Sequence, residues 1–196
     1  MLHIVYGGSA SGKSSYAESF AMSLQGEGRL LYIATMYPYK WNTTEIDPET
    51  MQRIERHRAM RADKGFDTVE CYRHVEHIVA KRQDVLLLEC MSNLLANEMY
   101  LEPDSNAGSD MAETMSPVSN KIVQALIDLS TRVQELVIVT NDVFSDGGSL
   151  TYDESTREYV KNLAEINCAL AREAATVPEV VCGIPVIVKK NHPMGK

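Results

Sequence analysis

The sequence predicts one α/β domain in which a mostly parallel sheet carries helices on both faces. Short apolar runs alternate with longer stretches of helical periodicity, an alternation typical of strands and helices packed in layers. Two runs, 84–89 and 135–140, are continuously apolar between polar ends, as expected of central parallel strands covered on both sides. Because 196 residues suit one domain with its own core, we expect a single unit over 1–196.

The first half of the chain predicts two strands, each followed by a helix. The apolar run 2–6 ends at two glycines, and a helical pattern follows over about 13–24. The run 30–34 is a second buried strand. Asp47 then provides an N-cap with proline at the first helical position, which predicts a helix that ends near Arg61.

The second half of the chain continues the alternation after the strand at 84–89. We expect helices over about 121–131 and 155–174, before and after the strand at 135–140. The valine-rich runs 180–181 and 186–188 are interpreted as closing strands joined by a hairpin. Between about 102 and 120 the composition shifts to Pro, Asp, Ser, Asn, Gly and Glu, which favours an exposed loop.

The composition excludes several classes of protein. A formal net charge of -8 argues against a chain that coats nucleic acid or an anionic membrane, so we expect neither as a partner. The four cysteines form no CxxC pair, which favours reduced thiols in a cytoplasm over a disulfide framework or a zinc knuckle. No apolar stretch is long enough to cross a bilayer, and the first residues do not resemble a secretory signal.

A phosphate-binding loop lies between the first predicted strand and the first predicted helix. The segment fits the pattern G-x-x-x-x-G-K-[ST] and consists of Gly7, Gly8, Ser9, Ala10, Ser11, Gly12, Lys13 and Ser14. In such a loop the backbone N–H groups and the helix N-terminus face phosphate oxygens, the lysine reaches the β and γ phosphates, and the last hydroxyl binds Mg²⁺. We therefore predict a P-loop NTPase-like fold that uses a nucleoside triphosphate.

A metal-binding carboxylate is expected at the end of a neighbouring strand. Glu89 ends the apolar run 85–88, and a P-loop requires such a group to hold Mg²⁺ directly or through water. Ser14 and Glu89 are therefore the predicted metal ligands. The alternative, a polar residue that merely ends a strand, stays open at this point.

The predicted helix before Arg61 carries a histidine among arginines. Ile54, His57, Arg58 and Arg61 fall on one helical face. A neutral imidazole can attack a phosphorus atom, and guanidinium groups can hold the phosphate oxygens. Taken alone, the pattern fits a solvated basic helix with an incidental histidine better. His74 and His77 are three residues apart, with no third metal ligand nearby.

Taken together, these features resemble a known family. The matching segments occur in order over most of the chain and are Ile4–Ser14, Leu31–Thr35, Arg53–Arg58, Thr68–Glu70, Leu86–Cys90, Val139–Val143 and Gly183–Pro185. They are similar to the bifunctional adenosylcobinamide kinase / adenosylcobinamide-phosphate guanylyltransferase of cobalamin biosynthesis. Residues 144–153 depart from that family, which usually has Gly-x-Gly-Ile-Val-Pro in this region.

The resemblance implies two reactions and a set of site residues. ATP or GTP phosphorylates the aminopropanol hydroxyl of adenosylcobinamide with the help of Lys13 and Mg²⁺. His57 then takes GMP from GTP and passes it to the cobinamide phosphate, giving adenosylcobinamide-GDP. Besides the loop, the implied nucleotide contacts are Ala34, Thr35, Met36, Arg58, Ala59, Met60, Arg61, Glu70 and Glu89. Relatives are cytoplasmic and resemble trimers in which a neighbouring subunit helps to complete the site.

Two other functions stay open on the sequence alone. A P-loop kinase of another small hydroxylated metabolite would leave His57 incidental. A GTPase-like switch would require a guanine-binding Asn-Lys-x-Asp motif, which the sequence lacks, since Thr140-Asn141-Asp142 does not replace it.

Overall fold

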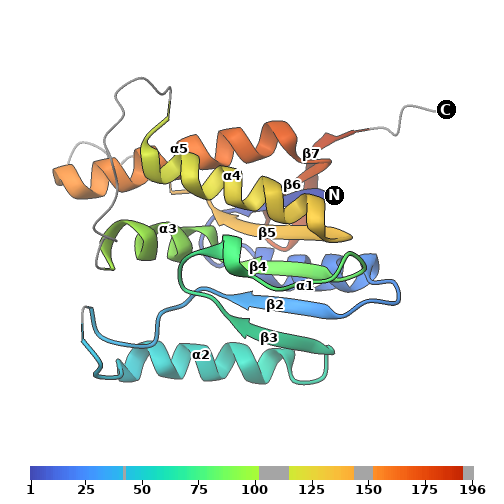
Figure 1. Cartoon of the computed structure of the whole chain (residues 1–196), viewed down its shortest axis with the longest axis horizontal. Helices are drawn as coiled ribbons and strands as arrows, with labels where there is room; N and C mark the ends of the chain where they lie inside the picture. The colour runs from blue at the N-terminus through green and yellow to red at the C-terminus, as the bar shows by residue number, and fades with distance from the viewer. Residues whose placement is uncertain (42, 102–114, 144–151, 192–196) are drawn as a thin grey trace.

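The computed structural model describes residues 1–41, 43–101, 115–143 and 152–191. Within them, seven strands form one sheet with helices on both faces (Figure 1), which confirms the predicted fold class. In chain order the elements are β1 (Leu2–Gly7), α1 (Lys13–Leu24), β2 (Leu30–Ala34), α2 (Pro48–Arg61), β3 (Phe66–Glu70), the 3₁₀ turn η1 (Val75–His77), β4 (Val85–Glu89), α3 (Met91–Tyr100), α4 (Pro117–Arg132), β5 (Glu135–Asn141), α5 (Glu154–Glu173), β6 (Thr176–Val181) and β7 (Ile184–Lys190).

The strand order and direction place the carboxyl ends of four strands side by side. The order is β3-β2-β4-β5-β1-β6-β7, and every pair is parallel except β6 with β7. The carboxyl ends of β2, β4, β5 and β1 therefore lie together at the same end of the strands, which is where ligands bind in open parallel sheets. The β6–β7 hairpin turns at Cys182 and Gly183, both with positive φ, and confirms the predicted closing hairpin.

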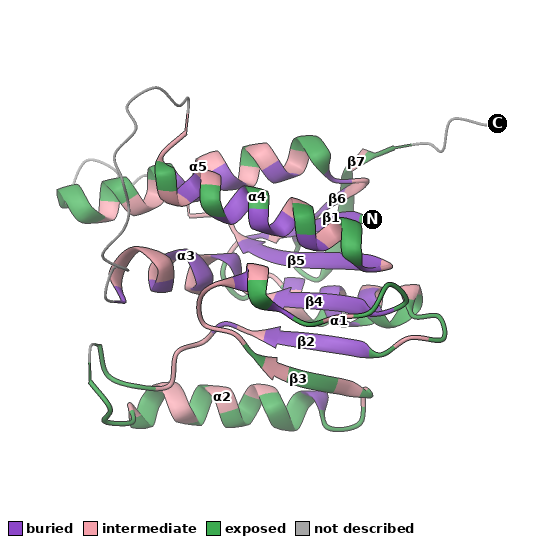
Figure 2. Ribbon diagram, viewed as in Figure 1, coloured by how far each residue is buried: buried purple, intermediate pink, exposed green. Residues whose placement is uncertain are grey.

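Alternate residues of the central strands enter two separate cores. In β4, Leu86 and Leu88 pack under α3, α4 and α5, whereas Val85 and Leu87 face α1 on the other side. Figure 2 shows β4 and β5 buried along their length. Burial on both faces explains why these strands are continuous apolar runs in the sequence.

Helix α2 follows the prediction from the sequence, but it does not pack into either core. It begins after Asp47, whose side chain accepts a hydrogen bond from the Thr50 backbone N–H at 3.4 Å, and it ends at Arg61. Within α2, all of which the structure describes, Arg61 alone is buried. In Figure 1, α2 lies beside β3 at the outer edge of the sheet. It is therefore held near the sheet mainly through polar contacts.

The prediction of a loop over about 102–120 is wrong at its C-terminal end. Helix α4 begins at Pro117, because Ser116 caps it by accepting from the Ser119 backbone N–H at 3.2 Å. Ser119 is fully buried against Asn162 of α5, so this part of the segment belongs to the core. Residues 102–114, and most of the divergent segment 144–153, lie outside the described residues.

The hydrophobic pattern of the sequence did not predict two elements, β3 and α3. Strand β3 is half exposed at the sheet edge and so lacks an apolar run, and α3 follows β4 after a single residue. The three-residue spacing of His74 and His77 is compatible with a helix, but the structure has only a 3₁₀ turn here, which ends at His77 and has His74 as its N-cap residue. Within the described residues, no helix has the length and apolar character that a membrane crossing requires.

Candidate active site

The loop between β1 and α1 adopts a compact shape that requires glycine at two positions. A Cβ atom on Gly7 would lie 2.7 Å from both the Val180 carbonyl oxygen and Ser11 Oγ. Gly12 has a φ of 89° and lies against the backbone of Gly183. The Gly183 N–H donates to the Ser11 carbonyl at 2.8 Å, so the β6–β7 turn supports the loop from behind.

Lys13 and Ser14 begin helix α1 at the mouth of this loop. The Lys13 side chain is buried, and its ammonium donates to the Gly8 carbonyl at 3.0 Å, so it lies across the loop. The positive end of the helix dipole and the ammonium together favour an anion at this point. A bound triphosphate would place its terminal phosphates here.

Ser14 and Glu89 lie together where β4 ends. Ser14 Oγ donates to Glu89 Oε1, while Glu89 Oε2 is buried without a hydrogen-bond partner among the described atoms. Burial raises the pKa of Glu89. A hydroxyl and a carboxylate are the oxygen ligands that Mg²⁺ takes when substrate phosphates and water complete its shell. The described residues contain no cluster of three or more His, Cys, Asp or Glu side chains that could hold a metal.

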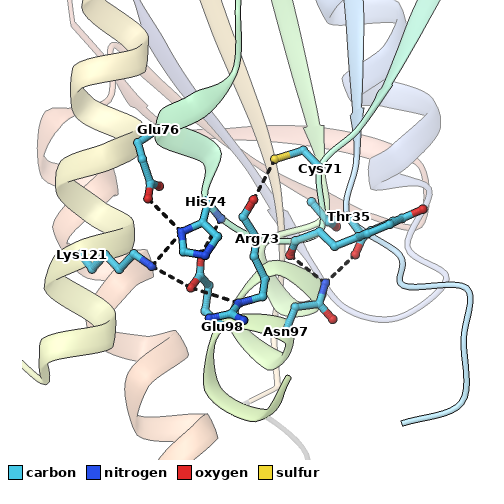
Figure 3. A network of polar contacts seen from close by, with 9 residues as sticks. Thr35, Cys71, Arg73, His74, Glu76, Asn97, Glu98 and Lys121 are labelled. Carbon is cyan, nitrogen blue, oxygen red and sulfur yellow. Dashed lines mark hydrogen bonds and ion pairs between the residues drawn. The ribbon is translucent and has the colours of Figure 1, made fainter. Parts of the chain in front are cut away.

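Thr35 connects the strands behind the site rather than lining it. It is fully buried, and its hydroxyl accepts from the Cys90 N–H at 2.8 Å. Its carbonyl accepts from the Asn97 side-chain amide at 2.8 Å, which also donates to the Tyr72 carbonyl at 2.9 Å (Figure 3). Thr35 therefore fixes the ends of β2 and β4 relative to α3 and to the chain after β3.

The basic face of α2 faces the phosphate loop. Arg61 places its guanidinium carbon 3.4 Å from the centroid of the Tyr32 ring, and two of its nitrogens are buried without a partner in the described structure. His57 lies half-buried one turn earlier. Burial, followed by the positive charges of Arg61 and Arg53, lowers the pKa of His57, so its imidazole is neutral at pH 7. A neutral imidazole among guanidinium groups is chemically able to attack a bound phosphate.

Two further ion pairs attach α2 and the residues after it to the sheet side of the site. Arg58 is paired with Glu70 at the end of β3, and Tyr72 donates to the same carboxylate at 2.8 Å. Lys64, just after α2, is paired with the buried Glu18 of α1. These contacts hold the histidine-bearing helix opposite α1 and leave an open space between the two.

A cavity of about 430 Å³ fills that space and brings most of the predicted site residues together. The predicted residues that line it are Ser9, Ala10, Lys13, Ser14, Ala34, Met36, His57, Arg58, Arg61, Glu70 and Glu89. Gly7, Gly8, Ser11 and Gly12 form the loop beneath it. Ala59 and Met60 do not line the cavity: both are exposed on α2, Met60 to 59%.

The sequence did not single out several residues that line this cavity. They are Tyr32, Tyr72, Cys90, Ser92, Asn93 and Asn141. The Asn141 side-chain amide donates to Ser92 Oγ at 2.7 Å, which joins the end of β5 to the first turn of α3. The rule that ligands bind at the carboxyl ends of parallel strands would have indicated the residues after β4 and β5. No sequence pattern marked Tyr72, because it follows an edge strand that carries no apolar run.

Comparison with known proteins agrees with this geometry. A family model described as cobinamide kinase / cobinamide phosphate guanyltransferase matches residues 3–188. No curated protein matches the chain. Among solved structures, the chain is similar to an ATPase domain, with 12% identity, a TM-score of 0.50 and coverage of 99% of this chain and 78% of that one. It is also similar to the flagellar accessory protein FlaH from Methanocaldococcus jannaschii, with 15% identity, a TM-score of 0.46 and coverage of 97% and 78%.

The two kinds of match differ in what they establish. At 12% identity, the likeness to the ATPase domain shows a shared fold and nothing finer. The family model spans nearly the whole chain, including the phosphate loop, the His57 helix and the strand that ends at Glu89. The chain therefore belongs to the CobU family, and it is a kinase and guanylyltransferase of cobalamin biosynthesis.

Proposed function

We propose that one cavity performs both reactions in sequence, and that His57 carries GMP between them. The observation that supports this proposal is the placement of His57 in the cavity that Lys13 and Ser14 also line. A nucleotide whose terminal phosphates occupy the loop lies between the loop and α2. The same scaffold can then present the γ-phosphate to one acceptor and the α-phosphate to the histidine.

In the kinase reaction, the terminal phosphoryl of ATP or GTP moves to the aminopropanol hydroxyl of adenosylcobinamide. Lys13 and the loop N–H groups hold the β and γ phosphates, and a Mg²⁺ ion, when bound, would supply further positive charge to the phosphoryl group in transfer. Ser14 and Glu89 are the residues that would hold this ion. The unpaired Glu89 Oε2 supports this assignment, because a buried carboxylate oxygen lacks a partner otherwise.

In the guanylyl transfer, the His57 imidazole attacks the α-phosphorus of GTP. A P–N bond forms, the P–O bond to the β-phosphate breaks, and pyrophosphate leaves. A phosphate oxygen of adenosylcobinamide phosphate then attacks the same phosphorus, which breaks the P–N bond and returns the imidazole. The lowered pKa of His57 supports this role, because only the neutral ring has a lone pair for the attack. Arg53, Arg58 and Arg61 surround the phosphates with positive charge.

The proposed assembly is a homotrimer in the cytoplasm, as the family resemblance implies. Strand β7 supports association, because it is an edge strand with exposed apolar side chains on both faces: Val186 (51%) and Val188 (66%) on one, and Ile187 (49%) on the other. An exposed apolar edge of this kind is typical of a surface that another chain covers.

Labelled nucleotides test the proposed function. The purified chain is incubated with GTP labelled on the α-phosphate or, in parallel, on the γ-phosphate. Retention of the α label alone is expected, in a bond that acid cleaves and alkali does not, as for a phosphoramidate. Added pyrophosphate should release the label as GTP. If the protein retained no α label, or retained γ label instead, the guanylylated intermediate would be excluded.

A further inference from the structure

A second cavity lies next to the nucleotide cavity, where the chain leaves β3. Its volume is about 1150 Å³, against about 430 Å³ for the nucleotide cavity. The two are adjacent, because Glu70 and Tyr72 line both of them. These two side chains are hydrogen-bonded to each other at 2.8 Å and form the boundary between the cavities.

The lining of the second cavity combines apolar surface with a polar border. Val69, Cys71, Ile78, Val79 and Leu101 provide apolar surface, and Val79 is 87% exposed. An apolar side chain exposed to this degree at a concave surface is a feature of ligand sites. The polar groups around it include Thr43 and Thr44 before α2, and His74 and His77 at the two ends of the 3₁₀ turn η1.

Two residues of the cavity wall, Arg73 and His74, contact the buried carboxylate of Glu98 in a network of polar contacts (Figure 3). The Glu98 carboxylate is almost fully buried, and it accepts from the His74 backbone N–H at 2.7 Å. The same carboxylate pairs with Lys121 at 3.0 Å and with Arg73 at 3.7 Å. The neighbouring Asn97 ties this wall to Thr35 behind the nucleotide cavity. Polar contacts therefore link the wall of this cavity to the nucleotide site.

The acceptor in the family reactions has a shape that this arrangement fits. Cobinamide is a large macrocycle with apolar ring faces, amide groups around its edge and one flexible arm that ends in the reacting hydroxyl. A cavity of about 430 Å³ lies within the range for ordinary small ligands, whereas about 1150 Å³ exceeds it. The smaller cavity has the phosphate loop and suits the nucleotide, and the larger one has the apolar surface and volume that a macrocycle needs.

We infer that the cavity lined by Val69, Cys71, Ile78, Val79 and Leu101 seats the corrin macrocycle of the acceptor. The inference rests on the proposed function, and it adds the place of the second substrate. With the macrocycle there, its arm crosses the boundary at Glu70 and Tyr72 and enters the nucleotide cavity. One seat then serves both reactions, because Lys13 and His57 line the same cavity beyond that boundary.

A charge introduced at the seat tests the inference without touching the nucleotide site. Val79→Arg places a cation against the apolar ring, and the exposure of Val79 means that the substitution removes little packing from the folded chain. Thr44→Arg does the same from a second element of the lining, the segment before α2, where Thr44 is also exposed. Met22→Arg is the matched control, since Met22 is an exposed apolar residue of α1 that lines neither cavity.

Equilibrium dialysis of adenosylcobinamide, followed by its visible absorbance, measures binding in the absence of nucleotide. Both seat variants should weaken binding about tenfold or more, as expected for a contact worth about 1.4 kcal/mol. They should raise the KM for the corrinoid in both reactions and leave labelling by α-labelled GTP unchanged. Met22→Arg should match the unaltered protein in every assay.

The results separate this inference from the proposed function. If the unaltered protein is labelled by GTP but both seat variants bind adenosylcobinamide as tightly as it does, the corrin seat lies elsewhere. A rise in KM for only one of the two reactions would also overturn the inference, because a shared seat must affect both. Failure of the unaltered protein to become labelled would instead contradict the guanylyl transfer, while the dialysis result would still report on the seat.

Discussion

At the scale of single residues, His57 acquires its chemistry from its neighbours. Burial and the charges of Arg61 and Arg53 lower its pKa, and Glu18 acts weakly in the opposite direction. The lowered pKa keeps the imidazole neutral at a pH where an ordinary histidine would begin to gain a proton. The same arginines that hold the phosphates therefore also maintain the nucleophile.

The pH dependence of self-guanylylation follows from this shift. The neutral ring is the reactive form, so the rate should fall on the acid side with a midpoint below the ordinary value of 6.5. Arg53→Gln removes one of the cations and should move the midpoint upward, towards 6.5. The measurement is the initial rate of α-label incorporation between about pH 5 and pH 8. Arg82→Gln, at an exposed site outside the cavity, is the control and should not move the midpoint. An unaltered protein with its midpoint at or above 6.5 would contradict this account.

The sequence predicted some residues of the site much better than others. The phosphate loop was predictable because its pattern, its strand and its helix all constrain the same eight positions. His57 was ambiguous without the family resemblance, because arginines on a helix face usually face solvent. Tyr32 was not foreseen, since its ring lies in a strand with the pattern of a core strand and only the folded chain brings Arg61 over it.

At the scale of elements, α2 shows why a polar helix can be mistaken for a solvated one. Its inner face borders a cavity rather than a core, so the usual apolar stripe is missing. Its position depends instead on Arg61 over Tyr32, the Arg58–Glu70 pair and the Lys64–Glu18 pair just beyond its end. The N-cap at Asp47 and the proline after it predicted where this helix begins, but not what the helix faces.

The start of α4 illustrates the opposite error, in which composition was interpreted as a loop. The expected loop extended to 120 because Ser, Pro and Asn dominate this stretch, but Ser116 and Pro117 are the residues that begin a helix well. Tertiary packing also favours the helix over a loop, since Ser119 is buried against α5. Polar composition alone does not distinguish a helix cap from a loop.

The cap at Ser116 should contribute measurably to stability. Its hydroxyl accepts from the Ser119 N–H and lies 2.7 Å from Asn162 Oδ1, to which it can donate. Ser116→Ala should lower the free energy of unfolding by about 1 kcal/mol, the usual loss for an N-cap. Urea denaturation followed by circular dichroism measures this change. Ser19→Ala, at an exposed position within α1, should change it by less than about 0.5 kcal/mol. Equal stability of the two variants would show that Ser116 does not act as a cap.

At the scale of the whole molecule, the two edges of the sheet differ. The β3 edge carries α2, which borders the nucleotide cavity, whereas the β7 edge carries exposed apolar side chains. The sequence predicted the β6–β7 end of the sheet in outline, but it did not predict β3 at the other end. It could not show that β7 is left uncovered, because an apolar strand has the same pattern whether a helix or another chain packs on it.

The proposed trimer can be tested at β7. The unaltered protein should sediment at three times its chain mass of 21.9 kDa. Replacing Val186 and Val188 together by lysine should yield a folded monomer, since lysines on an edge strand oppose association. Met22→Lys is the control and should remain a trimer. A monomeric unaltered protein, or a double variant that stays trimeric, would rule out β7 as the subunit interface.

The central claim is that one scaffold holds two separable chemistries, and His57→Asn tests it most directly. Asparagine has similar polarity but no comparably nucleophilic nitrogen. With α-labelled GTP and adenosylcobinamide, the variant should carry no label and form no adenosylcobinamide-GDP, yet still form adenosylcobinamide phosphate. Lys13→Ala should lose both activities, each by about 10²-fold or more, because both use the phosphate loop. Accumulation of GMP-protein by the His57→Asn variant would contradict the account and place the nucleophile elsewhere.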